Sequence, residues 1–85
     1  MNSIITENKI LNKKKYSAGE TYLLEMPGGI AVVVFDSKNS LLYKRIFPYV
    51  EGIKKEVKRI AFKVFKETQK GLLTKNFNFI EVIGE

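Results

Sequence analysis

The segment from Pro48 to Lys70 carries the pattern that most constrains how this chain folds. Aliphatic residues follow one another within it and just before it, at spacings of four, three, four, three and four: Ile46, Val50, Ile53, Val57, Ile60 and Val64. This periodicity is typical of the apolar stripe of an amphipathic helix, and Ala61 and Phe65 widen the stripe. Pro48 suits the first turn of a helix, and Gly71 suits the position that ends one. The sequence therefore predicts one long helix over residues 48–70.

The other side of this predicted helix is basic. At about 100° per residue, five cationic side chains fall on one side, at spacings of four, four, three and four. They are Lys55, Arg59, Lys63, Lys66 and Lys70. Phe62 lies at the edge of this row. Such a row attracts phosphate backbones or an anionic membrane surface, although a solvated helix face in a lysine-rich protein produces the same pattern.

The length and the net charge of the chain limit how these patterns can be interpreted. The chain has 85 residues, which predicts a single domain over residues 1–85. Its net charge is +6, from 15 lysines and arginines against 9 acidic residues, and this sign favours polyanionic partners. Only Arg45 and Arg59 are arginines. Because lysine acts as a point charge suited to phosphates, whereas arginine more often reads bases, the composition favours backbone contacts over base reading.

Two missing residue types remove most catalytic and metal-binding schemes. The chain has no cysteine, so a disulfide framework and a thiolate zinc site are excluded. It has no histidine, which is the commonest general base and metal ligand. We therefore predict that the protein is not an enzyme and holds no metal or cofactor. The enzymatic alternative is a histidine-free ribonuclease that works with Tyr43, Lys44, Arg45 and Tyr49.

The rest of the chain is typical of strands. Before the helix, strands are predicted over residues 3–12, 20–26, 30–35 and 41–47, and after it over residues 76–83. Pro27-Gly28-Gly29 predicts a tight hairpin turn, and Lys13-Lys14-Lys15 is expected in a solvated loop or at a guarded sheet edge. The segment Ile30–Phe35 is apolar on both faces, which indicates a central strand covered on both sides. The expected fold class is α+β: an antiparallel β-meander of about four strands, then one long amphipathic helix across a face of the sheet and a C-terminal strand.

The leading functional hypothesis is a small nucleic-acid-associated accessory or regulatory protein. The basic helix row would contact phosphates, joined by Lys13, Lys14, Lys15, Lys44 and Arg45. Tyr16, Tyr22, Tyr43 and Phe62 are candidate platforms on which bases stack. The sequence leaves open whether the nucleic acid is DNA or RNA.

The alternative is a protein-interaction module that binds no nucleic acid. The doubly apolar strand and the near-heptad helix stripe both suit a homodimer, either as an assembly factor or as a phage- or plasmid-encoded inhibitor of a host complex. A membrane partner is not expected, because the core needs the apolar stripe of the helix. No apolar run approaches the length that spans a bilayer, and we expect a cytoplasmic protein.

Overall fold

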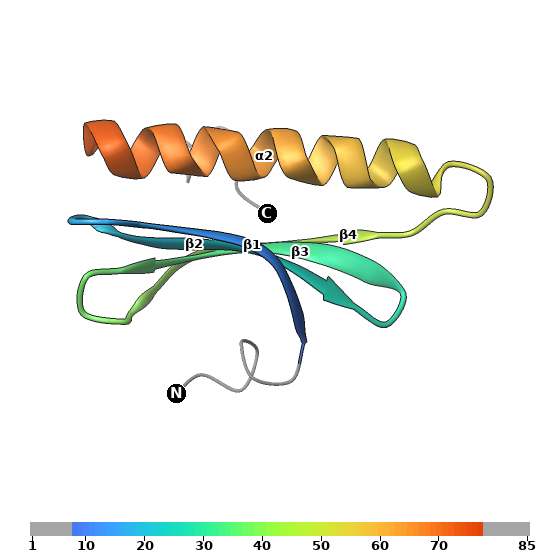
Figure 1. The fold of residues 1–85 in the computed structure, drawn as a ribbon, viewed down its shortest axis with the longest axis horizontal. Coiled ribbons are helices and arrows are strands. Elements are labelled where there is room, and N and C mark those ends of the chain that lie inside the picture. Colours follow the sequence, from blue (N-terminus) through green and yellow to red (C-terminus); the bar gives the residue numbers. More distant parts are fainter. Residues whose placement is uncertain (1–7, 78–85) are drawn as a thin grey trace.

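The structure is a computed structural model that describes residues 8–77 of the chain. Four strands precede one helix: β1 (Lys9–Tyr16), β2 (Gly19–Met26), β3 (Gly29–Asp36), β4 (Leu41–Pro48) and α2 (Lys54–Thr74). The strands form one antiparallel sheet in the order β1-β2-β3-β4, and α2 lies across one of its faces (Figure 1). The predicted α+β meander followed by one long helix is confirmed.

The two hairpin turns that lead into β3 and β4 follow from their local sequence. Gly28 has a φ of 80°, a conformation that glycine adopts without steric cost, and it closes the predicted β2–β3 hairpin. In the next turn the Asp36 carboxylate accepts the backbone N–H groups of Lys38 and Ser40, both at 2.8 Å. This side-chain capping of the turn is the reason aspartate is common there.

The first strand continues further along the chain than predicted, and residues 3–7 of the predicted strand lie outside the described residues. Lys13, Lys14 and Lys15 belong to β1, an edge strand of the sheet, rather than to a loop, and they pair with Tyr22, Thr21 and Glu20 of β2. The register shifts between Ile10 and Asn12, so the alternation of apolar residues is interrupted there. That irregularity explains why the sequence pattern around this strand is loose.

The start of the helix was also predicted too early. Pro48 is the last residue of β4, and the Tyr49 N–H still donates to the Gly28 carbonyl at 2.9 Å. A turn follows, closed by the Ile53 N–H on the Val50 carbonyl at 3.0 Å, with Gly52 at a φ of 88°. Because a positive φ does not fit a right-handed helix, α2 begins only after this turn.

The end of the helix lies beyond the predicted stop. Gly71 is buried inside α2, which continues to Thr74, and Lys75 takes the left-handed conformation with its N–H on the Gly71 carbonyl. Packing of Leu72 on the sheet outweighs the low helix propensity of glycine. Of the strand predicted over residues 76–83, Asn76 and Phe77 are in no strand, and the remainder lies outside the described residues.

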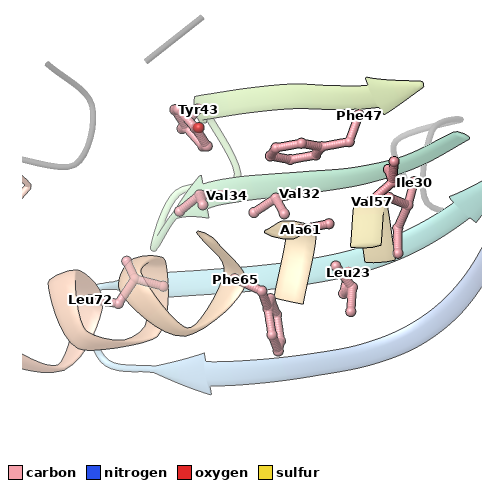
Figure 2. Close-up of a cluster of buried hydrophobic side chains, with 10 residues drawn as sticks. All are labelled: Leu23, Ile30, Val32, Val34, Tyr43, Phe47, Val57, Ala61, Phe65 and Leu72. Atoms are coloured by element: carbon pink, nitrogen blue, oxygen red, sulfur yellow. The ribbon is translucent and has the colours of Figure 1, made fainter. Parts of the chain in front are cut away.

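The buried face of α2 is rotated from the predicted stripe. Ile53 and Ile60 are 47% and 52% exposed, so their assignment to the core is wrong. The buried helix residues are Val57, Ala61, Phe65, Thr68, Gly71 and Leu72. Figure 2 shows four of them, Val57, Ala61, Phe65 and Leu72, in one cluster with side chains of three strands, namely Leu23, Ile30, Val32, Val34, Tyr43 and Phe47. Burial of the large Phe65 ring, with small Ala61 allowing close approach, decides this rotation.

One buried polar contact joins the helix to the sheet. The hydroxyls of Thr21 on β2 and Thr68 on α2 are 2.7 Å apart, and both residues are fully buried. The Thr68 hydroxyl also lies 2.6 Å from the Phe65 carbonyl, to which it donates. Since both side chains have partners, burying them costs little, and the pair sets the position of α2 along β2.

The other face of the sheet holds a second apolar cluster. It consists of Leu24, Ala31, Val33 and Phe35, all buried, with Tyr22 and Met26 packed against them. Every residue from Gly29 to Phe35 of β3 is buried. The prediction that this strand is central and covered on both sides is therefore confirmed.

Two phenylalanines of α2 test the rotation of the helix. Phe65 is fully buried, whereas Phe62 is 40% exposed. We expect Phe65→Ala to lower the free energy of unfolding by about 3–5 kcal/mol, because it leaves a cavity under the helix. The matched Phe62→Ala change should lower it by about 1 kcal/mol. Urea unfolding followed by circular dichroism measures both, and equal losses would contradict the rotation.

Candidate nucleic-acid interface

The exposed ridge of α2 carries the basic row. We define the helix crest as Lys55, Arg59, Lys63, Lys66 and Lys70, all of which are exposed. At about 100° per residue they lie on the side of the helix opposite Val57, Ala61 and Phe65, which are buried on the sheet. The crest extends roughly 22 Å along the helix axis, with neighbouring cations about 4–6 Å apart in axial rise.

The charges of the crest are only lightly neutralised within the chain. Arg59 pairs with Glu56 at 2.9 Å, but its side chain is 74% exposed, so this pair contributes little. The Lys66 ammonium lies 5.0 Å from the centre of the Phe62 ring. Within residues 8–77, no acidic side chain pairs with Lys55, Lys63 or Lys70. The crest thus presents a positive surface to solvent.

The lysines of β1 lie on an edge strand, away from the crest. Lys14 pairs with Thr21, whose side chain faces α2, so Lys14 is on the helix side of the sheet. Lys13 and Lys15 alternate with it and therefore lie on the opposite face, where Lys15 is 3.8 Å from Glu20.

Lys44 and Arg45, the predicted basic pair on β4, also lie on opposite faces of the sheet, at its other edge. Lys44 is opposite Val33, on the face away from the helix. Arg45 is opposite Val32, on the helix side, and its guanidinium lies 4.9 Å from the centre of the Phe47 ring. The structure therefore brings the five crest residues together but does not bring the lysines of β1 and this pair to the same surface.

The rings predicted as stacking platforms are occupied by contacts within the protein. The hydroxyl of Tyr16 donates to Gln69 at 3.4 Å, and Tyr43 is only 5% exposed. Tyr22 meets Phe35 edge to face, with ring centres 6.0 Å apart, and its hydroxyl donates to Glu20. The fourth ring, Phe62, is partly covered by Lys66.

The residues of the ribonuclease alternative do not converge. Tyr43 is buried under α2, and Lys44 and Arg45 point to opposite faces. The Tyr49 hydroxyl donates to the Glu25 carboxylate at 2.8 Å. These four residues therefore do not form a common site, and the described residues contain no group of three potential metal-ligating side chains.

A cluster that the sequence analysis missed joins the end of β4 to the start of α2. Lys58 lies 3.7 Å from Glu25, and Lys54 lies over the Tyr49 ring at 4.7 Å from its centre. The hydrogen bond from Tyr49, with the positive charge of Lys58, holds the pKa of Glu25 below its usual value, whereas burial acts in the opposite direction. These two lysines are therefore engaged with the sheet, which separates them from the crest.

Comparison with known proteins finds no matching family model, curated protein or solved structure. Among the described residues, no helix is long and apolar enough to cross a membrane.

The hydrogen bond between Tyr22 and Glu20 can be tested through the pKa of the Tyr22 phenol. The hydrogen bond to Glu20, followed by burial and the carboxylate charge, raises the pKa of Tyr22 from 10.0 to about 12. In the unfolded chain this phenol ionises near its ordinary pKa of about 10. Between these values the folded state keeps a proton that the unfolded state loses, so Tyr22 should make stability fall as pH rises through this window.

Titration of the ultraviolet absorbance of ionised tyrosine measures this shift. Subtracting the curve of Tyr22→Phe isolates the contribution of Tyr22, since the pKa values of Tyr43 and Tyr49 are also raised. In Glu20→Gln we expect the Tyr22 step to move towards its ordinary value. A step that stays in place in this variant would show that Glu20 is not the cause.

Proposed function

We propose that the protein binds nucleic acid by its phosphate backbone through the helix crest, and that it acts as a small DNA-binding or RNA-binding accessory or regulatory protein. The observation that carries this proposal is the gathering of five exposed cations on the solvent side of one long helix. Cations that neutralise phosphates release condensed counterions, and this release supplies most of the affinity of sequence-independent binders.

The rigidity of the crest supports the proposal. The backbone beneath the five cations is held by the buried contacts of Phe65, Thr68 and Leu72 with the sheet. Lysine side chains still lose rotamer freedom on binding, but the helix that carries them is already ordered. The net charge of +6 adds attraction at longer range.

Fluorescence anisotropy of labelled nucleic acids at several salt concentrations tests the proposal. If all five crest cations contact phosphates, the slope of log affinity against log salt should be about −4.5 on a DNA duplex and about −3.5 on single strands. Absence of binding at low salt to single-stranded DNA, duplex DNA and RNA would contradict the proposal.

A double variant tests the crest itself. In Lys63→Gln with Lys70→Gln, we expect the slope on duplex DNA to fall from about −4.5 to about −2.7, because two phosphate contacts are lost. The matched control is Lys9→Gln with Lys38→Gln, which removes the same charge from exposed positions outside the crest. The control should keep the slope of the original protein, and equal losses in both variants would indicate attraction by net charge without a site.

A protein-interaction module is the second candidate, because one flank of α2 exposes aliphatic side chains. Ile53 and Ile60 lie on the flank opposite Gln69 and Lys58, the residues that contact β1 and β2. Val50, in the turn before the helix, is also 51% exposed. A homodimer, or an inhibitor that docks on a host complex in the cytoplasm, would bury this flank.

The flank is tested by the oligomeric state in solution. If the homodimeric form of the second candidate is correct, light scattering after gel filtration should show a dimer at micromolar concentration. The variant Ile60→Glu should then be monomeric, because a charge at the centre of an apolar contact is costly to bury. A monomeric original protein that binds nucleic acid would favour the crest over the flank.

A further inference from the structure

We infer that the ligand of the helix crest is double-stranded DNA of any sequence. This inference rests on the proposed function, since it names the class of nucleic acid that the same crest accepts. Four features of the described residues carry it: the engaged aromatic rings, the convex shape of the crest, its amino-acid content and its lack of hydroxyl groups.

The engaged aromatic rings argue against single-stranded ligands. Proteins that bind single strands hold successive bases on exposed aromatic faces, in a groove that follows the backbone. Here the Tyr16 hydroxyl is hydrogen-bonded to Gln69, the Tyr22 ring packs on Phe35, and Tyr43 is buried. Of the two aromatic rings of α2, Phe65 is buried and Phe62 is 40% exposed, with Lys66 over its ring. The single ring of Phe62, which Lys66 already contacts, cannot hold a run of unpaired bases.

The shape of the crest suits the wide groove of a DNA duplex. An α-helix with its side chains is about 10–12 Å across, and the major groove of B-form DNA is about 12 Å wide. One side of α2 is buried on the sheet, and the opposite side, which bears the crest, faces solvent (Figure 1). Because the sheet prevents deeper entry, the long lysine side chains would meet the phosphates along the two walls of the groove.

The amino-acid content of the crest argues against base reading. Sequence is read in the major groove mainly by arginine, asparagine and glutamine, whose side chains make paired hydrogen bonds with base edges. Four of the five crest residues are lysines, and Arg59 is the one crest residue with a guanidinium that can make paired hydrogen bonds. Gln69, on the neighbouring flank, accepts the bond from Tyr16. A crest with a single arginine among lysines is suited to backbone contacts rather than to reading a sequence.

The lack of hydroxyl groups separates DNA from RNA. The major groove of an RNA duplex is deep and narrow, so proteins recognise it across the minor groove through its 2′-hydroxyls. The crest carries only cationic donors. Thr74, further along α2, donates its hydroxyl to the Lys70 carbonyl at 2.8 Å. A helix of this kind fits the open groove of DNA better than either groove of RNA.

Competition between four labelled probes of equal length tests the inference at one low salt concentration. The probes are two DNA duplexes of shuffled sequence and equal composition, one of their single strands, and the matching RNA duplex. We expect the DNA duplexes to bind within about twofold of each other and at least about tenfold more tightly than the single strand and the RNA duplex.

The outcomes separate this inference from the proposed function. A single strand or RNA duplex bound as tightly as the DNA duplexes, or a clear difference between the two sequences, overturns the inference and leaves the proposed function standing. Absence of binding to every probe overturns both. The variant Phe62→Leu adds a check that does not depend on charge. It should leave duplex affinity unchanged, whereas a several-fold loss would indicate base stacking and overturn the inference.

Discussion

The contact of Phe65 and Ala61 with the sheet is the interaction on which the other features depend. Phe65 is buried in one cluster with Leu23 and Val32, and the small Ala61 lets the helix backbone approach the strands. Once this face is buried, the rotation of α2 about its axis is determined. The hydroxyl pair of Thr21 and Thr68 then fixes its position along β2. Every exposed feature of the helix follows from these contacts.

The crest is the first consequence. With Phe65 turned to the sheet, the five cations of the helix point to solvent. Because their charges stay hydrated, folding carries no desolvation cost for them. Lys54 and Lys58, on the same helix, lie instead near Tyr49, which follows β4, and Glu25, near the end of β2. The same rotation therefore sorts the lysines into those that support the fold and those that are available to a partner.

The exposed aliphatic flank is the second consequence. Ile53 and Ile60 continue the periodic stripe in the sequence, but only one side of α2 faces the sheet, and that side contains Phe65 rather than the two isoleucines. Burying the aromatic ring removes more apolar area from water than burying an isoleucine, so the isoleucines are left at the flank. A surface that interacts with another protein would use these two residues, whereas one that binds phosphates would use the crest.

The sequence by itself determined the four-stranded meander followed by one helix, the hairpin at Pro27–Gly29, the doubly buried strand and the basic side of the helix. These features depend on local periodicity and turn chemistry, which short segments of sequence contain. Only the tertiary structure decided where α2 begins and ends, which of its apolar residues are buried, and which lysines share a surface. Those features depend on contacts between segments far apart in the chain: Phe65 against the strands, Thr68 against Thr21, and Tyr16 against Gln69. Burial of a large ring contributes more free energy than small differences in periodicity and helix propensity. Packing therefore determines which face of α2 is buried and where the helix begins and ends, which the sequence pattern alone does not distinguish.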